Sequence, residues 1–219
     1  MVAVSVYSKP LGGIAGRARV FPDVLQTIDR RLRAAKGAEL SDFVVTHIGD
    51  RVVCLTVCAD ENAAAAEALR TEAFADGETV AAARKLFKNP APAAECRLMF
   101  PERESEEFVL LMTGSEDALF WSDIVSVSAG QAAGAPSVMF CRTEGIFYPT
   151  AELLEMFAGR SVNARGVCPV SLCEGGVVRT NVMPVVALGF SLGNGRLTGP
   201  VDLFDSPLFD AARMRASET

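Results

Sequence analysis

The stretch DFVVTHIGDRVVCLTVCAD, residues 42–60, decides the fold because it predicts two antiparallel strands. Valine-rich runs flank Gly49-Asp50, a dipeptide that is typical of a tight turn between strands. Side chains alternate between the two faces of a strand, so Cys54 and Cys58, four residues apart, share a face. We expect these thiols to be buried and reduced in a core. Such a strand pair needs further strands or helices to cover it.

The segments before and after this pair predict a mixture of strands and helices. Residues 2–8, VAVSVYS, alternate between apolar and polar side chains and predict a strand. Residues 22–37, PDVLQTIDRRLRAAKG, predict a helix that begins at its proline and stops by its final glycine. The alanine-rich residues 60–87 predict a second helix, with Asp60 as its cap and a break or a kink at Gly77.

The second half of the chain carries more strand signals. Residues 94–100 and 107–114 predict a second strand pair across a charged turn, and residues 183–204 predict a hairpin around Asn194-Gly195. Shorter signals predict a strand at 137–142, helices at 149–159 and 206–218, and a loop at 126–136. The pattern predicts one α+β domain, residues 1–219. We expect a layered sandwich of mainly antiparallel sheets with helices on the outside.

Composition and charge exclude several classes of function. The formal net charge is −6, and no cluster of Lys and Arg forms the basic surface that nucleic acid requires. No segment has the roughly 18 apolar residues that span a bilayer. The first residues, MVAVSVYSKP, lack the basic and apolar regions of a signal peptide. We therefore expect a cytoplasmic protein with neither nucleic acid nor membrane as a partner.

Common catalytic motifs are missing from the sequence. No P-loop and no G-x-S-x-G elbow occurs, and the glycines of LGGIAG, residues 11–16, have the wrong spacing for dinucleotide binding. His47 is the single histidine, which limits any catalytic triad to one base. The cysteine spacings do not match a zinc knuckle.

Four collinear stretches carry longer motifs. Residues 5–37 contain SVYSKPLGGIAGRARVFPDVL, residues 44–53 read VVTHIGDRVV, residues 106–121 read EEFVLLMTGSEDALFW, and residues 184–218 begin PVVALGFSLGNGRLTGPVDLFDSPLFD. Together they resemble the bifunctional fructose-1,6-bisphosphate aldolase/phosphatase family of archaea and deep-branching bacteria. The corresponding family motifs are K-A-D-x-G-G-x-x-G-H, V-T-H-x-G-D-D, F-M-A-D-K and A-L-G-F-x-L-x-N-G-K-L-x-G-P-x-D-M-F-D.

This resemblance implies a compact α+β sandwich that assembles as a homo-oligomer. It also implies a chemistry in which carboxylates hold Mg²⁺ ions that bind sugar phosphate, and in which a lysine forms a Schiff base for the aldol step. Mg²⁺ prefers oxygen ligands, so the family chemistry depends on clustered aspartates.

The sequence departs from the family where those metal ligands stand. Pro10 replaces the loop aspartate, Arg17 replaces the loop histidine, and Arg51 replaces the second aspartate of the pair. Gly114 stands at a further aspartate, and the segment with the Schiff-base lysine is deleted between about 159 and 165. We therefore expect no metal ion, no cofactor, and neither of the family's two activities.

Cationic side chains in these places predict a pocket for a small anionic metabolite. Lys9, Arg17 and Arg51 would stand where the family has metal cations, and Arg160 lies near a family arginine that contacts phosphate. Arginine presents a rigid fork of donors to carboxylate or phosphate. The substrate-binding candidates are therefore Arg17, Arg51 and Arg160. The alternative is that the arginines only neutralise Asp50.

The catalytic candidates are His47, Asp50 and Lys9. His47 or Asp50 would handle a proton, and Lys9, if it is buried near the two arginines, would offer a nucleophilic amine. His47 fits a structural role equally well, because the family keeps this histidine without using it as a main metal ligand. Lys9 fits an ordinary surface position at a strand end. The sequence thus predicts a metal-independent enzyme on a small anionic carbonyl metabolite, with lyase, aldol-type or cyclisation chemistry in specialised biosynthesis. The alternative is a non-catalytic pseudoenzyme that binds a metabolite or a protein partner.

Overall fold

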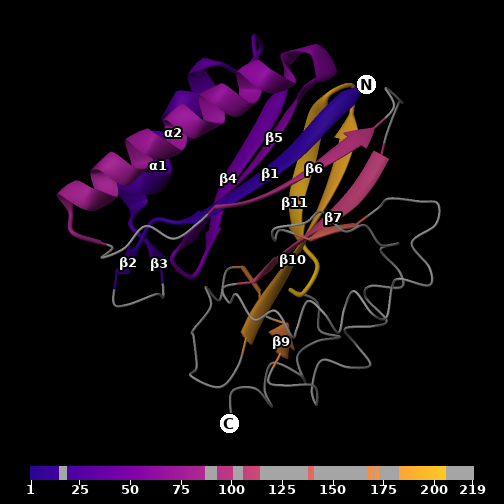
Figure 1. The fold of residues 1–219 in the computed structure, drawn as a ribbon. Helices are drawn as coiled ribbons and strands as arrows, with labels where there is room; N and C mark the ends of the chain where they lie inside the picture. Colours follow the sequence, from indigo (N-terminus) through magenta and orange to yellow (C-terminus); the bar gives the residue numbers. More distant parts are fainter. Residues whose placement is uncertain are drawn as a thin grey trace.

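The computed structural model of the chain contains two packed sheets and a layer of helices (Figure 1). It describes residues 1–14, 19–86, 93–100, 106–113, 138–140, 167–169, 171–172 and 183–205. The predicted loop at 126–136 and the predicted helices at 149–159 and 206–218 lie outside the described residues. No helix among the described residues is long and apolar enough to cross a membrane.

The first sheet has four antiparallel strands in the order β4-β5-β1-β6. These strands are β1 (Val2–Pro10), β4 (Asp42–Ile48), β5 (Arg51–Ala59) and β6 (Ala94–Phe100). The predicted hairpin of β4 and β5 is confirmed, and Gly49 adopts a positive φ of 55° in its turn. Two short strands, β2 (Gly13–Ile14) and β3 (Arg19–Val20), pair with each other after β1.

Two helices, α1 (Pro22–Ala34) and α2 (Ala63–Ala83), cover one face of the first sheet (Figure 1). Proline lies in the first turn of α1, as its fixed φ favours. The apolar side of α1 consists of Val24, Ile28 and Leu32, all fully buried. Cys54 and Cys58 face this helix layer and are buried, free thiols, as the sequence predicts.

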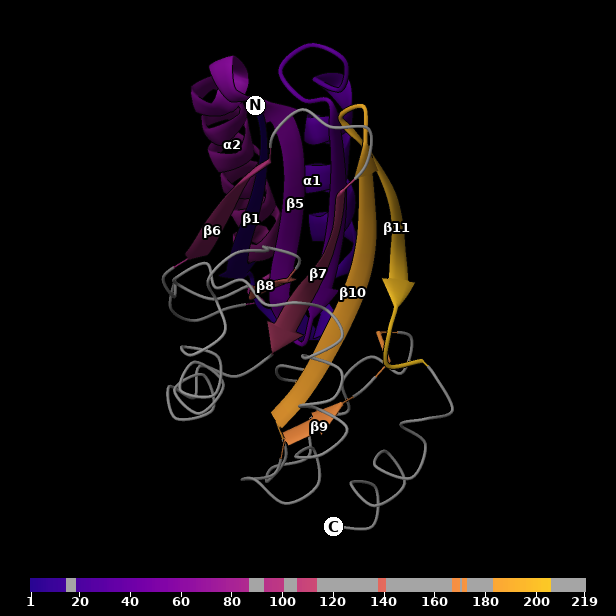
Figure 2. The same cartoon turned by 90° about the vertical axis from the view of Figure 1, so that its right-hand side faces the viewer.

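The second sheet has five strands and packs against the other face of the first sheet (Figure 2). Its strands are β7 (Glu106–Thr113), β8 (Val138–Phe140), β9 (Val167–Pro169), β10 (Met183–Gly193) and β11 (Arg196–Asp202). The pairs β7–β8 and β9–β10 are parallel, and β7–β10 and β10–β11 are antiparallel. The predicted α+β class with mainly antiparallel sheets is therefore confirmed.

Apolar side chains from both sheets form the core between them. Val4, Val6 and Leu55 of the first sheet pack with Phe108 and Phe190 of the second. The two phenyl rings stack with their centroids 5.4 Å apart. The β10–β11 hairpin turns at Asn194-Gly195, as predicted, and both residues have positive φ.

Of the break or kink expected at Gly77, the break is wrong, because α2 runs through this residue without interruption. A Cβ at Gly77 would lie 2.9 Å from Cδ1 of Ile28 and 3.3 Å from Cδ1 of Leu11. The glycine therefore lets α2 approach α1 and the end of β1 closely. Asp60 is not a cap either, because it lies in a 3-10 turn and α2 has Asn62 at its N-cap.

The expected pairing of residues 94–100 with residues 107–114 is also wrong. Both segments are strands, but β6 pairs with β1 in the first sheet and β7 pairs with β10 in the second. The chain thus passes from one sheet to the other between them. Each strand finds its partner through long-range packing, which neighbouring positions in the sequence do not reveal.

Candidate functional site

The candidate site lies at the end of the first sheet where β1 stops and β5 begins. Pro10 pairs with Arg51 at the last position of this ladder. The backbone N–H of Leu11 donates to the carbonyl oxygen of Asp50 at 3.0 Å, which fastens the end of β1 to the Gly49-Asp50 turn. The structure thus brings Lys9, Asp50 and Arg51 to one end of the sheet.

Arg51 points toward the second sheet and is nearly buried, with 9% of its surface exposed. Its Nε–H donates to Oγ of Ser8 at 3.1 Å. Ser8 is itself buried on β1. Sequence reasoning missed Ser8, whose contact with Arg51 depends on the β1–β5 register. The alternation of side chains gives its face only once that register is known.

Lys9 points to the opposite face, toward the helices. Its Nζ forms an ion pair and hydrogen bond with the carboxylate of Glu78 on α2. Neighbouring residues of a strand face opposite sides of a sheet, so Lys9 cannot share a face with Ser8. The structure therefore separates Lys9 from Arg51 by the thickness of the sheet. Sequence reasoning also missed Glu78, because a salt bridge across 69 positions leaves no local signal.

His47 lies on β4, on the same face as Lys9. It pairs with Val52 of β5, and Val52 in turn pairs with Lys9. Two strand spacings, about 10 Å, therefore separate the backbones of His47 and Lys9. The remaining candidates, Arg17 and Arg160, lie outside the described residues.

A group of charged side chains surrounds Tyr7 on the helix side of the first sheet. Arg70 of α2 is buried, lies 5.1 Å from the centre of the Tyr7 ring, and forms an ion pair with Glu95 of β6. The Tyr7 ring also packs edge-on against Phe74 at 4.6 Å. Burial raises the pKa of Tyr7, although the charges of Lys9 and Arg70 act in the opposite direction. Its phenol therefore stays protonated at neutral pH.

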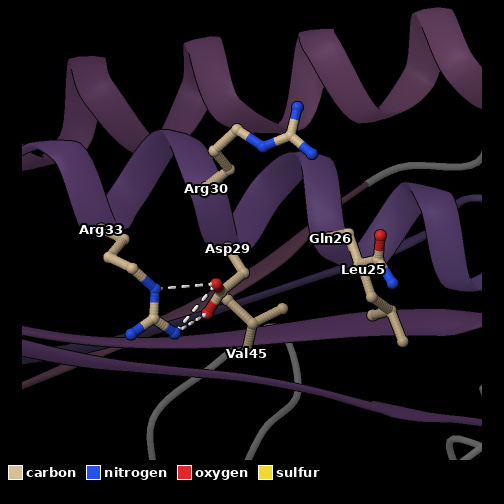
Figure 3. Close-up of a pocket in the computed structure, with 6 residues that line it drawn as sticks. All are labelled: Leu25, Gln26, Asp29, Arg30, Arg33 and Val45. Atoms are coloured by element: carbon tan, nitrogen blue, oxygen red, sulfur yellow. Dashed lines mark hydrogen bonds and ion pairs between the residues drawn. The ribbon is translucent and has the colours of Figure 1, made fainter.

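No group of metal-binding side chains joins the candidate residues in the described part of the chain. No three His, Cys, Asp or Glu side chains of the described residues gather in a way that could hold a metal ion. An open hollow of about 460 Å³ lies elsewhere, beside α1 and β4 (Figure 3). Arg33 and Asp29 form an ion pair at 2.9 Å on its wall. The residues that line it are Leu25, Gln26, Asp29, Arg30, Arg33 and Val45.

Comparison with known proteins identifies the family. The model of a family described as fructose-1,6-bisphosphatase matches residues 1–91 and 114–219. The chain belongs to this family. The matched ranges include the end of β1, the β4–β5 turn and the β10–β11 hairpin, which are the places that carried the resemblance in the sequence.

Curated relatives agree with this assignment but are much longer. The fructose-1,6-bisphosphate aldolase/phosphatase of Ignicoccus hospitalis is 33% identical over 128 residues, which is 54% of this chain and 33% of that protein. The enzyme of the same name from Metallosphaera sedula is 34% identical over 42% of the chain and 27% of its own length. The match to the enzyme of that name from Moorella thermoacetica covers 31% of its length. The chain thus spans about a third or less of these relatives.

Proposed function

We propose that this family member binds a small anionic carbonyl metabolite at the end of the first sheet and acts on it without a metal ion. The proposed reaction is of the lyase, aldol-type or cyclisation class and belongs to specialised biosynthesis. In this proposal the chain has lost the Mg²⁺-dependent phosphatase and the Schiff-base aldolase activities that the family resemblance implies.

The position of Arg51 is the observation that carries the proposal. The resemblance puts a metal-binding carboxylate at this residue, and the chain has a nearly buried guanidinium there that donates to Ser8. A fixed positive charge repels Mg²⁺ and attracts an anion, and the planar fork of arginine suits carboxylate or phosphate. The loss of the aldolase rests on the sequence, which has no lysine after Lys88.

The proposed roles follow from the place of each residue. Arg51 binds the anion, and Arg17 and Arg160 are proposed to assist it. Asp50 and His47 are proposed to transfer protons, and Lys9 is proposed to supply an amine that acts on the carbonyl group. Since Lys9 and Arg51 point to opposite faces, a ligand that meets both must lie across the end of the sheet, over Pro10 and the adjoining turn.

A non-catalytic binding protein is the second candidate function. The observation that favours it is that these cations already have protein partners. Lys9 binds Glu78, and Arg51 donates to Ser8. In that case the sheet end recognises a metabolite or a protein partner without converting it.

Ligand-induced stabilisation tests the binding step. We would measure the melting temperature with phosphate, glyoxylate and pyruvate as probes, in EDTA, for the wild type and for Arg51→Met and Arg51→Lys. Arg97→Met is the matched control, because Nε of Arg97 makes the same kind of contact to Ser5, at 3.2 Å, away from the site. We expect at least one probe to stabilise the wild type and Arg97→Met but not Arg51→Met.

The variants test the proposed site, and a second measurement decides between the enzyme and the binding protein. Equal stabilisation of Arg51→Met and the wild type contradicts the proposed site. A stabilising carbonyl probe is then followed by proton NMR in the presence of the wild type. Its consumption supports the enzyme, and unchanged signals support the binding protein.

A further inference from the structure

The pair formed by Lys9 and Glu78 joins β1 to α2 on the helix side of the first sheet. Their side chains are 19% and 32% exposed, so both are largely withdrawn from water. A partly buried ion pair keeps more of its attraction than one at a fully exposed surface. The pair therefore holds the Lys9 amine in a defined place.

Close packing beside the pair fixes the place of Glu78. Gly77, the preceding residue, lies where α2 comes closest to Ile28 of α1 and to Leu11. Leu11 follows Lys9 by two residues and is buried. The contact of Gly77 with Ile28 and Leu11 fixes the distance between α2 and β1, and it therefore also fixes the position of Glu78 relative to Lys9.

The surroundings of Lys9 include a second proton donor. Tyr7 lies on the same face of β1, two residues before Lys9, and its ring is held by Phe74 and Arg70. Arg70 pairs in turn with Glu95 of β6, and His47 of β4 lies two strands away on this face. Lys9 thus faces one carboxylate directly, with a protonated phenol beside it.

We propose that Glu78 is a positioning residue for Lys9 and accepts the proton that Lys9 must release before its amine can act on a carbonyl group. The ammonium of Lys9 gives one proton to a carboxylate oxygen of Glu78, which leaves a neutral amine and a neutral carboxyl group. This inference rests on the proposed function, which counts Lys9 among the catalytic residues. It adds a residue from α2 that no motif of the sequence marks.

A merely structural ion pair has the opposite consequence for Lys9. An opposite charge stabilises the ammonium form, so removing the charge of Glu78 would make a purely structural Lys9 more reactive. If Glu78 positions the amine and takes its proton, removing its charge makes Lys9 less reactive. The direction of the change therefore separates the two roles.

Reductive trapping with glyoxylate measures that direction. The neutral amine adds to the aldehyde, the adduct takes up a proton and loses water to give an iminium ion, and cyanoborohydride supplies the hydride that reduces it to a stable carboxymethyl amine. Mass spectrometry of the peptides that contain Lys9 and Lys36 gives the rate at which Lys9 is modified relative to Lys36. Lys36 is a suitable reference because it also pairs with a carboxylate, that of Asp42. The variants are Glu78→Gln, Glu78→Asp and, as a matched control on the same helix, Glu72→Gln.

We expect Glu78→Gln to slow the modification of Lys9 relative to Lys36 by about tenfold or more, as the loss of a positioned base does. Glu78→Asp should restore part of the rate, and Glu72→Gln should leave it unchanged. An equal or faster rate in Glu78→Gln overturns the proposal. If Glu78→Gln does not fold, Glu78→Asp decides, because a faster rate than in the wild type then overturns it.

This experiment stands apart from the test of anion binding at Arg51. It uses neither Arg51 nor a native substrate. If Lys9 is modified more slowly in Glu78→Gln and no anion stabilises the protein, the results support the role of Glu78 and contradict the proposed anion site. If the modification rate of Lys9 is unchanged and an anion stabilises the protein through Arg51, the results contradict the role of Glu78 and support the anion site.

Discussion

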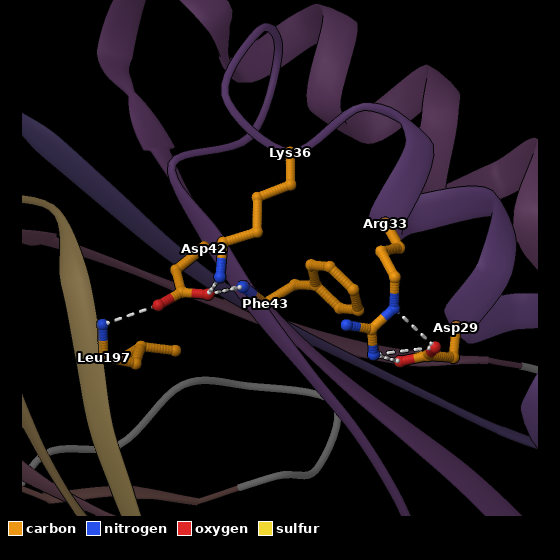
Figure 4. A network of polar contacts seen from close by, with 6 residues as sticks. All are labelled: Asp29, Arg33, Lys36, Asp42, Phe43 and Leu197. Atoms are coloured by element: carbon orange, nitrogen blue, oxygen red, sulfur yellow. Dashed lines mark hydrogen bonds and ion pairs between the residues drawn. The ribbon is translucent and has the colours of Figure 1, made fainter.

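The carboxylate of Asp42 accepts the backbone N–H of Leu197 at 3.0 Å and so joins β4 to β11 across 155 positions of the chain. Its other oxygen accepts the Nζ of Lys36 at 2.6 Å and the backbone N–H of Phe43 at 2.9 Å (Figure 4). A Cβ at Gly195, in the hairpin turn, would lie 3.4 Å from Cβ of Ser41, the residue before Asp42, so the turn comes close to the start of β4. One nearly buried side chain therefore fastens the end of α1, the first sheet and the second sheet together.

The Asp42 contacts predict a loss of stability in acid. Burial acts to raise the pKa of Asp42, but the hydrogen bonds from Lys36, Leu197 and Phe43 outweigh it and hold the pKa below its ordinary value. The folded state thus binds this proton less readily than the unfolded chain. The stability from Asp42 is present above the unfolded pKa of about 3.9 and is lost as the pH falls through the lower folded value.

Asp42→Asn tests this contribution. We expect it to lower the free energy of unfolding at pH 7 by about 1–3 kcal/mol, since hydrogen bonds to a charged group are lost. The difference from the wild type should shrink from pH 5 toward pH 2, because protonation removes the same charge there. Urea unfolding followed by circular dichroism measures both. Asp205→Asn, at an exposed position, is the control, and a difference that does not change with pH contradicts the assignment to Asp42.

The strands and turns of this fold could largely be predicted from the sequence, and their partners only in part. The β4–β5 and β10–β11 hairpins have local turn signals, so their strands and their pairing were both predictable. The partners of β6 and β7 depend on which sheet each joins, and no nearby residue records that choice. The continuous helix α2 is a second example. Glycine at position 77 allows close contact with Ile28 of α1, and the sequence near Gly77 does not reveal that contact.

Gly77→Leu should destabilise the protein through this contact. A Cβ already meets Cδ1 of Ile28 at 2.9 Å, so a larger side chain must push α2 away from α1. Overpacking of this kind costs about 1–3 kcal/mol, which exceeds the gain of up to about 1 kcal/mol from replacing a helical glycine. Ala75→Leu is the control on the exposed face of the same helix. Chemical unfolding that shows Gly77→Leu to be as stable as the control would contradict the close approach.

Cys54 should be unreactive as long as the protein is folded. Burial raises the pKa of Cys54 to about 12, although Arg70 acts in the opposite direction. The thiolate is the reactive form, and an unfolded cysteine has a pKa of about 8.5. The folded state keeps this proton, so the associated stability is present below about pH 8.5 and is lost as the pH rises toward 12.

Iodoacetamide labelling with mass spectrometry measures this protection at pH 8. We expect Cys54 to be labelled in urea and to remain almost unlabelled in buffer. Labelling of Cys54 at equal rates in the two conditions would show that the thiol is accessible in the folded protein. The same experiment between pH 9 and pH 11, combined with urea titrations, follows the expected fall in stability.

The candidate site was predicted from the sequence as a set of residues and not as an arrangement. The resemblance predicted a pocket that includes Lys9, Asp50 and Arg51, and the structure places these three residues at one end of the first sheet. It could not give the face of each side chain, because that depends on the register of β1 against β5. Ser8 lies 43 positions from its partner Arg51, and Glu78 lies 69 positions from its partner Lys9. Only the folded chain therefore reveals these two contacts.

The guanidinium of Arg51 stands where the family resemblance puts a carboxylate. Its presence should abolish the response of the site to Mg²⁺. We expect the wild type to release no phosphate from fructose-1,6-bisphosphate with Mg²⁺, and its melting temperature to be the same in Mg²⁺ and in EDTA. Arg51→Asp places a second carboxylate next to Asp50, and oxygen ligands are what Mg²⁺ requires, so Mg²⁺ should stabilise this variant. The Metallosphaera sedula relative is the positive control for phosphate release. Mg²⁺-dependent phosphate release by the wild type would show that the guanidinium at Arg51 does not exclude the metal, and it would contradict the proposed metal independence.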